Sequence, residues 1–478
     1  MNVSGLRVRS PVAAMERHFG RMAEVWNENL EGGKIREALS PGSAGGTVQT
    51  HVQLRVSRSG RRPMRGTEHV LESEVMAMTD VAAEPLTFDP YDYGFHENPY
   101  PLYRRLRAEA PLYHNPGLGF WALSRHADVG AGFRDSVRLS NANGVSLDPA
   151  AWGPHAHRTM SFLALDDPRH LRLRQLVSKG FTPRRVAAMD TRIRELTLQH
   201  LEPALAAGSF DWIEQVAGKL PMDVISELMG VPEPDRAEIR RLADLVVHRE
   251  DGVLDVPVTA VEATFELIGY YAEMIAQRRR ARTEDLTSAL LDAEADGDRL
   301  TDEEILGFMF LMVIAGNETT TKLLGNALYW AATYPEQYAK VAANTGLVPD
   351  WVEETLRYDT SSQILARTAT TDLEFHDGVV PEGAKVLLLV GSANRDENVF
   401  ADPEIYDIER PDKGGLLSFG RGVHFCLGAH LARLEASIAL REFADRVRAY
   451  EVDLAGIERV HSTNVRGFAK LPVTVQVR

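Results

Sequence analysis

The most informative segment of this chain is Leu417-Ser418-Phe419-Gly420-Arg421-Gly422-Val423-His424-Phe425-Cys426-Leu427-Gly428. Its three glycines allow a tight loop whose backbone N–H groups turn toward the cysteine sulfur. A helix is predicted to begin at Ala429, and the positive end of its dipole favours a thiolate over a thiol. Cys426 is therefore a candidate nucleophile or metal ligand, although most lone cysteines are small buried hydrophobes.

The composition narrows the class of protein. The chain has one cysteine in 478 residues, which excludes an intramolecular disulfide and a multi-cysteine zinc or iron–sulfur site. Lys and Arg number 53 and Asp and Glu 68, so the net charge of −15 argues against a nucleic-acid-binding protein. With 44% hydrophobic and 25% charged residues, the composition is that of an ordinary globular protein.

The chain shows no pattern for membrane insertion or export. The longest nearly unbroken apolar run, Ile305–Ala315, is well short of the roughly 20 residues that a membrane-spanning helix needs. It predicts a buried core helix instead. The N-terminus lacks the basic and then apolar pattern of a secretory signal. We therefore expect a soluble, cytoplasmic protein without a membrane anchor.

Residues 1–80 differ from the remainder, because they are rich in Arg, Gly and Ser and show little apolar periodicity. We expect a flexible N-terminal extension or a mis-chosen start there, and a single domain over residues 81–478. Beyond Phe88 most segments follow the helical i, i+3, i+4 pattern. The predicted helices are Pro101–Glu109, Pro168–Lys179, Arg184–Ala207, Pro221–Gly230, Pro234–His248, Thr259–Arg282, Asp302–Thr333, Pro335–Ala343 and Ala429–Val447, and the predicted strands are Phe120–Leu123, Lys385–Val390 and Pro472–Val477. The predicted fold class is mainly α with small peripheral β-sheets.

The segment Phe419–Gly428 closely resembles the haem-binding loop of the cytochrome P450 superfamily, soluble bacterial type. The resemblance implies that Cys426 is the proximal thiolate ligand to the iron of haem b (iron protoporphyrin IX). It also implies that Phe419 and Gly420 lie beside this cofactor and that His424 hydrogen-bonds a haem propionate. A thiolate ligand donates electron density that favours O–O cleavage.

The region before the cysteine loop also matches the superfamily. Glu354-Thr355-Leu356-Arg357 resembles its Glu-x-x-Arg element, although these residues alone are typical of an ordinary ion pair on a helix surface. Arg410 matches the third member of that network. Ala393–Asp396 and Phe400–Pro403 match the family's stretch between these elements, and Arg367 falls where the family places a propionate-binding arginine.

A fourth block, Asp167–Arg174, contains His170 and Arg174 at i, i+4 spacing, so both project from one helix face. In isolation this pattern is equally typical of a solvated face. By resemblance the pair binds the haem propionates, together with Arg367 and His424. Four donors facing two carboxylates are reasonable, because charge-assisted hydrogen bonds are the strong ones.

The long apolar helix predicted from Asp302 contains Ala315-Gly316-Asn317-Glu318-Thr319-Thr320 near its centre. Polar residues and a glycine are costly inside a buried helix, which suggests a functional reason rather than a local kink. By resemblance this is the distal helix over the haem. Gly316 would give dioxygen room, Thr319 would hydrogen-bond oxygen and water, and Glu318 would relay protons.

The resemblance implies a haem-thiolate monooxygenase fold, with haem between the distal helix and the cysteine loop. It implies insertion of one oxygen atom from O₂ into a lipophilic small molecule, such as a fatty acid, steroid, terpenoid or polyketide, by hydroxylation or epoxidation. No flavin or ferredoxin sequence is attached, so we expect a monomer served by a separate ferredoxin and an NAD(P)H-dependent ferredoxin reductase. Arg172 and Arg421 are candidate docking charges; the run Arg278–Arg282 is more typical of a solvated helix end.

Two other functions are compatible with parts of the sequence. A haem-thiolate peroxygenase would use H₂O₂ directly, but the intact Glu318-Thr319 pair favours O₂ activation. A cysteine hydrolase would pair Cys426 with His424, which lie two residues apart and share a face if the segment is extended. No Asp or Asn in the loop orients that histidine, and the hydrolase interpretation leaves the other blocks unexplained.

Overall fold

The structure is a computed structural model that describes residues 85–478 except 249–255, 296 and 412. The described residues from Leu86 onward belong to one unit. The predicted N-terminal extension, residues 1–80, lies outside the described residues. Among the described residues, no helix is both long enough and apolar enough to cross a membrane.

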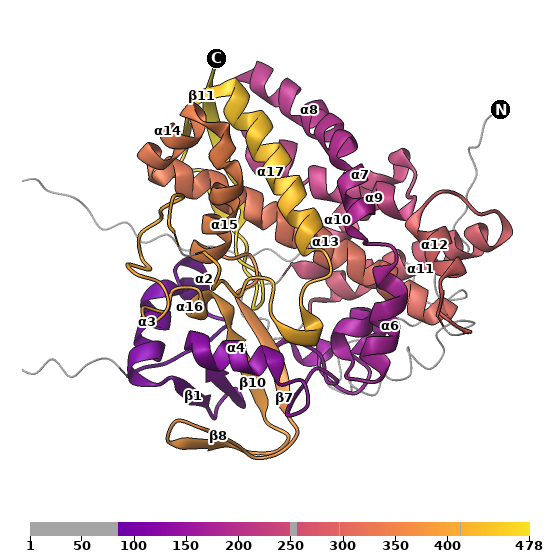
Figure 1. Ribbon diagram of the computed structural model, residues 1–478, viewed down its shortest axis with the longest axis vertical. Coiled ribbons are helices and arrows are strands. Elements are labelled where there is room, and N and C mark those ends of the chain that lie inside the picture. The colour runs from indigo at the N-terminus through magenta and orange to yellow at the C-terminus, as the bar shows by residue number, and fades with distance from the viewer. Residues whose placement is uncertain (1–84, 249–255, 296, 412) are drawn as a thin grey trace, which may run out of the picture. The chain divides into compact units, whose positions relative to one another are not determined.

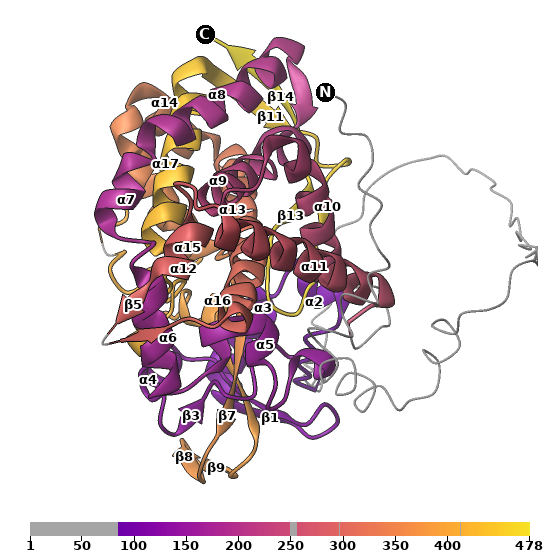
Figure 2. The same cartoon turned by 90° about the vertical axis from the view of Figure 1, so that its right-hand side faces the viewer.

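Helices make up most of this unit (Figure 1). Helix α13 runs near the middle in both views, with α8, α14 and α17 toward the upper end (Figure 2). The helices are α2 (Tyr93–Glu97), α3 (Tyr100–Glu109), α4 (His126–Arg134), α5 (His157–Met160), α6 (Arg169–Ser178), α7 (Pro183–Ala188), α8 (Asp190–Ala207), α9 (Leu220–Met229), α10 (Arg236–Val247), α11 (Val258–Arg280), α12 (Leu286–Asp292), α13 (Asp302–Thr333), α14 (Pro335–Ala343), α15 (Val348–Tyr358), α16 (Val390–Ala393) and α17 (Ala429–Arg446).

The main sheet joins segments that are far apart in the sequence. Its strand order is β1-β2-β10-β7-β3, in which β10 pairs parallel with β2 and antiparallel with β7. A second sheet has the order β11-β14-β4, and the described residues also form three two-stranded sheets. The strands are β1 (Leu112–Asn115), β2 (Phe120–Leu123), β3 (Leu139–Ser140), β4 (Ser209–Asp211), β5 (Glu294–Ala295), β6 (Asp298–Arg299), β7 (Ile364–Ala369), β8 (Leu373–Phe375), β9 (Gly378–Val380), β10 (Lys385–Leu389), β11 (Val447–Val452), β12 (Glu458–Arg459), β13 (Phe468–Lys470) and β14 (Pro472–Val477).

Helix α13 is the central helix of the unit. It begins with a capping box, in which the Thr301 side chain accepts from the N–H of Glu304 and the Glu304 side chain accepts from the N–H of Thr301. Helices α5, α9, α11, α15 and α17 all pack against it. This surrounding explains why most of its side chains are buried. Of the predicted core run Ile305–Ala315, the residues up to Val313 are buried, whereas Ala315 is exposed.

The predicted fold class is confirmed, and the bounds of most predicted elements agree with the structure to within two residues. The single helix predicted over Arg184–Ala207 is wrong, because the chain forms α7 and α8 instead. Between them the N–H of Met189 bonds to the carbonyl O of Val186 (3.0 Å), a tighter i→i−3 turn that interrupts the α-helical ladder.

Candidate active site

The loop that precedes α17 is shaped by glycine. Gly422 has a φ of 72°, and a Cβ at this position would lie 2.8 Å from the carbonyl O of Phe133, so a larger residue does not fit. Gly420 also has a positive φ, of 66°. The N–H of Cys426 donates to the carbonyl O of Phe419 (2.9 Å), which closes the loop around the cysteine.

The sulfur of Cys426 accepts hydrogen bonds from the N–H groups of Gly428 and Ala429, as the predicted helix start implies. Burial nevertheless outweighs these bonds and raises the pKa of the Cys426 thiol. Within the polypeptide alone, desolvation therefore opposes the predicted preference for a thiolate, whereas the two N–H groups favour it. Cys426 retains accessible surface, so a cation that bound its sulfur would stabilise the thiolate.

Two histidines from distant segments meet beside this loop. His170 of α6 and His424 have ring centroids 4.0 Å apart. Both ring nitrogens of His424, and Nε2 of His170, are buried and lack a hydrogen-bond partner among the described residues. Burial, followed by the charges of His170, Arg367 and Arg174, lowers the pKa of His424 to about 2. These buried nitrogens are therefore available to a ligand.

Two arginines complete the group of donors. Arg367 of β7 is 3% exposed, and burial lowers its pKa to about 10. Its one hydrogen bond within the described chain runs from Nη1 to the carbonyl O of Ala366 (2.7 Å). Arg174 of α6 donates from Nη2 to the carbonyl O of Phe425 (2.5 Å), next to Cys426. His170, Arg367 and Arg174 all lie close enough to His424 to lower its pKa, so the four donors occupy one region.

This donor set fits haem. A buried cluster with positive charge and unpartnered nitrogens requires an anionic partner, because isolated buried charges and unbonded polar atoms are costly. Two propionates supply four acceptor oxygens, and the accessible sulfur of Cys426 supplies one soft ligand to iron. Among the described residues there is no cluster of three His, Cys, Asp or Glu residues suited to a separate metal ion.

The predicted distal residues lie at the centre of α13. The Thr319 hydroxyl donates to the carbonyl O of Ala315 (2.8 Å), and Ala315 is exposed although this part of the helix is otherwise mostly buried. Glu318 is buried and forms an ion pair with Lys322, one turn later (2.9 Å). A Cβ on Gly316 would lie 3.6 Å from Ile225 of α9, so its missing side chain leaves space on that side of the helix.

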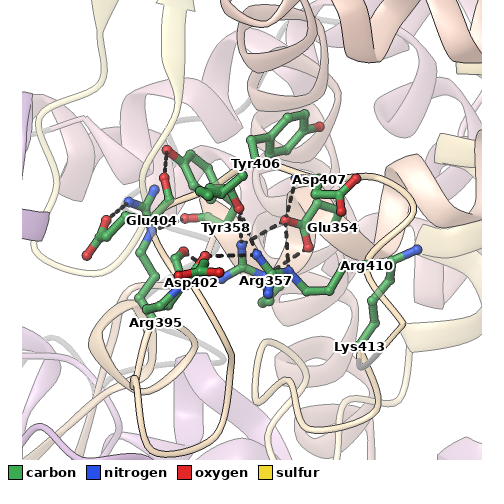
Figure 3. A network of polar contacts seen from close by, with 12 residues as sticks. Glu354, Arg357, Tyr358, Arg395, Asp402, Glu404, Tyr406, Asp407, Arg410 and Lys413 are labelled. Atoms are coloured by element: carbon green, nitrogen blue, oxygen red, sulfur yellow. Dashed lines mark hydrogen bonds and ion pairs between the residues drawn. The ribbon is translucent and has the colours of Figure 1, made fainter.

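The Glu-x-x-Arg element forms a buried network (Figure 3). Arg357 donates to both carboxylate oxygens of Glu354, at 2.8 and 2.7 Å, in the bidentate geometry of strong ion pairs. Arg410 approaches the same carboxylate at 3.5 Å, as predicted for the third member, and the N–H of Asp407 donates to it at 2.9 Å. Arg357 also donates to the carbonyl O of Pro403 (2.9 Å), which ties α15 to the stretch before the cysteine loop.

Comparison with known proteins assigns the family. A family model described as cytochrome P450 matches residues 258–348 and 343–477. The mycobacterial protein named cytochrome P450 123, from Mycobacterium tuberculosis, is 62% identical over 402 residues, which cover 84% of this chain and 100% of the relative. The chain belongs to the cytochrome P450 family. It is therefore a haem-dependent monooxygenase with bacterial relatives.

Other relatives of this cytochrome P450 are more distant. Cytochrome P450 monooxygenase PikC from Streptomyces venezuelae is 38% identical over 388 residues, covering 79% of this chain and 91% of that relative. The crystal structure of CYP109E1 from Bacillus megaterium in complex with corticosterone matches with a TM-score of 0.72 and 31% identity, covering 80% of this chain and 99% of that structure. Both similarities extend over the described unit, in agreement with the confirmed fold class.

One of the two predicted docking charges is paired within the molecule. Arg172 forms ion pairs with Asp298 and with Glu304 (2.6 Å), so its charge is neutralised within the molecule. Arg421 has no ion pair among the described residues and donates from Nη2 to the carbonyl O of Gly415 (3.1 Å). A free charge on the cysteine side of this cytochrome P450 therefore remains at Arg421.

The arginine run at the end of α11 is mostly exposed to solvent, as predicted, and it also forms ion pairs. Arg278 pairs with Asp285 (2.6 Å), Arg282 pairs with Asp292 (3.0 Å), and Arg279 pairs with Asp302. These ion pairs connect α11 to α12 and to the start of α13. The run therefore joins neighbouring helices, which the local sequence did not predict.

The hydrolase alternative fails on geometry as well as on family membership. Neither ring nitrogen of His424 has a hydrogen-bond partner among the described residues, so this histidine does not activate Cys426 as a general base.

Sequence reasoning also missed Lys322 as the partner of Glu318. The available signal was the i, i+4 spacing of an acid and a base on one helix.

Proposed function

We propose that this cytochrome P450 hydroxylates or epoxidises a lipophilic small molecule, inserting one oxygen atom from O₂. The observation that supports the site assignment is a group of buried, unpartnered histidine nitrogens, with the buried Arg367 and the half-buried Arg174 nearby, beside an accessible cysteine. Haem, when bound, supplies the oxygen-activating chemistry, because a thiolate ligand favours O–O cleavage. The polypeptide then has three tasks, namely to hold the cofactor, to deliver protons and to orient the substrate.

For cofactor binding, we assign the Cys426 sulfur as the iron ligand. His170, Arg174, Arg367 and His424 would donate to the two propionates. Buried histidine nitrogens lack a hydrogen-bond partner, and within the described chain the hydrogen bonds of the two arginines run to backbone carbonyl groups rather than to carboxylates. The nearest protein carboxylate, on Asp167, reaches Nδ1 of His170 at 3.3 Å and leaves Nε2 free for the ligand.

Phe419 and Gly420 would lie beside the cofactor within the cysteine loop. Phe419 is held by the guanidinium of Arg433, whose carbon lies 4.4 Å from the ring centroid. Gly420 has a positive φ of 66°, which allows the turn that directs the loop toward the sulfur. Both residues would therefore shape the surface around the Cys426 ligand rather than react.

For proton delivery, we assign Thr319 and Glu318. The Thr319 Oγ1–H is directed at the carbonyl O of Ala315 (2.8 Å) and is free to rotate toward water on the exposed side of that residue. The carboxyl group of Glu318, one residue before Thr319 on α13, would pass protons to water near Thr319. Gly316 would leave room for dioxygen beside this pair.

The segments proposed to contact substrate are largely apolar. They are Asn143–Ala164, Asp244–Leu254, Phe310–Ala315, Ser361–Leu365 and Gly467–Phe468, of which residues 249–254 lie outside the described part of the chain. Such linings favour lipophilic ligands. A fatty acid, steroid, terpenoid or polyketide fits this chemistry, and the relative crystallised with corticosterone supports testing steroids first.

Electrons would come from a separate ferredoxin and its NAD(P)H-dependent ferredoxin reductase. The single cysteine leaves no ligands for an iron–sulfur cluster in this chain. Ferredoxin would dock near Arg421, the unpaired charge on the cysteine side. We place the reaction in the cytoplasm, where NAD(P)H is available, and propose that the enzyme acts as a monomer.

The decisive experiment is the absorption spectrum of the reduced, CO-bound holoprotein. We expect the red-shifted Soret band of a thiolate ligand, and we expect Cys426→Ser to abolish it. Protein that binds no haem, or a CO adduct without that band, would overturn the proposal. Steroids and fatty acids are then scored for displacement of distal water by the change in spin state. Product formation with H₂O₂ alone, at the rate seen with the redox partners, would favour a peroxygenase.

A further inference from the structure

Three buried polar side chains lie along one side of α13. Glu318, Lys322 and Asn326 follow one another at i, i+4 spacing, so they project from the same face of the helix. They are 5%, 4% and 0% exposed. Burying a polar side chain is costly unless a partner compensates it, and of these three residues only Glu318 has a role in the proposed function. The partners of the other two therefore show what they do.

Lys322 and Asn326 both bind the backbone that leads into β13. Nζ of Lys322 donates to the carbonyl O of Phe468, the first residue of β13 (3.3 Å). Nδ2 of Asn326 donates to the carbonyl O of Arg466 (3.2 Å). The segment that they hold includes Gly467–Phe468, which is proposed to contact substrate. Two side chains one turn apart on α13 therefore fasten a substrate-contact segment to the distal helix.

Glycine makes this close approach possible. A Cβ on Gly467 would lie 2.6 Å from the Cβ of Lys322 and 2.8 Å from its Cδ. On the helix side, a Cβ on Gly325 would lie 3.5 Å from the ring of Phe468. The stem of Lys322 is therefore confined against the backbone before β13, and its ammonium group has a fixed position.

Lys322 differs from Asn326 in a second contact. Its Nζ lies 2.9 Å from Oε2 of Glu318, so one ammonium group joins the proposed distal acid to the carbonyl of Phe468. Oε2 is buried and has no hydrogen-bond partner among the described residues, so the ion pair leaves this oxygen able to accept a hydrogen bond from water. Within the described chain, the side-chain hydrogen bonds of Asn326 run to two backbone carbonyl groups and not to Glu318.

We propose that Lys322 is a positioning residue that fixes the Glu318 carboxyl group for proton delivery by anchoring it to the substrate-contact segment before β13. This inference rests on the proposed role of Glu318. The anchor is effective because the carbonyl of Phe468 belongs to the backbone and does not rotate with a side chain, so the ammonium between the two holds the carboxyl group in one place. Lys322 neither gains nor loses a proton in this role.

The test separates the two contacts of Lys322 in the haem-loaded protein. Lys322→Met removes both contacts, whereas Asn326→Leu loosens the same backbone segment and leaves the ion pair in place. NADPH oxidation with a surrogate ferredoxin and reductase shows how many electrons leave as H₂O₂ instead of water, with or without a substrate. We expect Lys322→Met to raise the ratio of H₂O₂ to water by up to about 100-fold, because a misplaced proton donor slows the proton-dependent step. Asn326→Leu should stay close to the wild type.

A double variant and a control complete this measurement. Glu318→Gln combined with Lys322→Met should release no more H₂O₂ than Glu318→Gln alone, because residues that act through one another are not additive. Lys340→Met is the matched control, since it removes a lysine from a more exposed ion pair, with Glu409, and should change nothing. Equal H₂O₂ release in Lys322→Met and Asn326→Leu would make Lys322 merely structural and would overturn the inference, as would additive effects in the double variant.

Thermal unfolding of the same variants gives a readout that does not depend on turnover. The midpoints should show coupling between Glu318→Gln and Lys322→Met, whereas Glu318→Gln and Asn326→Leu should add. Additive midpoints for the first pair would overturn the inference. Failure of the proposed function is distinguished by the CO spectrum of the wild type, because a missing thiolate band does not remove the coupling in the thermal midpoints.

Gly467→Ala is a second route to the same answer if Lys322→Met does not fold. The variant keeps the ammonium group, but the new Cβ displaces the stem of Lys322. H₂O₂ release should therefore rise in the same direction as in Lys322→Met. Wild-type release in a folded Gly467→Ala protein would contradict the proposed anchor.

Discussion

Two buried arginines of this cytochrome P450 differ in the hydrogen-bond acceptors that the chain provides for them. Arg357 is 0% exposed, and its guanidinium binds both carboxylate oxygens of Glu354 and the carbonyl O of Pro403. Arg367 is nearly as buried, at 3%, but within the described chain it has one hydrogen bond, to the carbonyl O of Ala366. The first arginine is satisfied by the fold, whereas the second is not.

This difference separates residues that stabilise the polypeptide from residues held for a ligand. Burying a charge without a partner destabilises a protein, so such a residue persists where another molecule completes it. His170 and His424 show the same lack of acceptors at buried nitrogens. Substitution of Arg357 should therefore lower the stability of the apoprotein, whereas substitution of Arg367 or of the two histidines should lower the affinity for haem.

The largest effect is expected for Arg357→Met. The change leaves the buried carboxylate of Glu354 with Arg410 at 3.5 Å and the N–H of Asp407, which compensate it only in part. Removal of one partner of a buried ion pair typically costs about 3–5 kcal/mol. Urea unfolding of the apoprotein should show this loss. Wild-type stability in this variant would contradict the view that the network is completed within the chain.

A smaller effect, on haem affinity rather than on the stability of the apoprotein, is expected for Arg367→Leu. The variant apoprotein should be as stable as the wild type or more stable, because an uncompensated buried charge is removed. Haem affinity should fall about 10- to 100-fold, since a hydrogen bond to a charged group contributes about 1.5–3 kcal/mol. Titration of apoprotein with haem measures this change. Arg448→Leu, at an exposed position on β11, is the control and should leave affinity unchanged.

The sequence predicted the parts of the site that are local. The cysteine loop, the Glu-x-x-Arg element and α13 each depend on residues close together in the chain, so short patterns were sufficient. The contact between His170 and His424, at 4.0 Å between ring centroids, depends on how α6 meets the loop, and only the family resemblance placed both at one ligand. The ion pairs of Arg172 with Asp298 and Glu304 had no local signal, so the sequence did not predict that this charge is paired within the molecule.

Packing explains one of the helices that the sequence did not predict. Helix α4 contains Gly130 and Gly132, which reduce helix propensity, and it was not predicted. In the structure a Cβ on Gly132 would lie 2.8 Å from the side chain of Leu388 of β10. The glycine is required because the helix lies directly on the main sheet, and this close approach is a tertiary constraint that outweighs local propensity.

The same comparison applies to two buried acids. Glu354 is surrounded by donors, whereas Oε2 of Glu435 on α17 has no hydrogen-bond partner among the described residues, and burial raises the pKa of Glu435 well above 4.5. The folded state therefore keeps a proton that the unfolded state releases above pH 4.5. The free energy of unfolding should therefore fall as the pH rises from 4.5 toward the raised pKa of Glu435 in the folded state, by at most about 1.4 kcal/mol per pH unit.

Glu435→Gln tests this sign directly. The amide cannot ionise, so the variant should match the wild type near pH 4.5 and exceed its stability at neutral and alkaline pH. Urea unfolding at several pH values measures the difference. Glu458→Gln, at an exposed position on β12, is the matched control and should follow the wild-type curve. Parallel curves for Glu435→Gln and the wild type would mean that Glu435 is satisfied in solution.

The smallest effect is expected for Gly316→Ala. This variant tests on which side of α13 the free space beside Gly316 lies. The added Cβ would be 3.6 Å from Ile225 and 3.7 Å from Met312, both ordinary van der Waals contacts. Alanine favours a helix over glycine by up to about 1 kcal/mol, so thermal stability should rise slightly. Because the methyl group would occupy space proposed for dioxygen, the rate of CO binding to the reduced protein should fall, with an unchanged thiolate band. A rate equal to that of the wild type would instead place the free space on the α9 side, next to Ile225, and contradict the proposed role of Gly316.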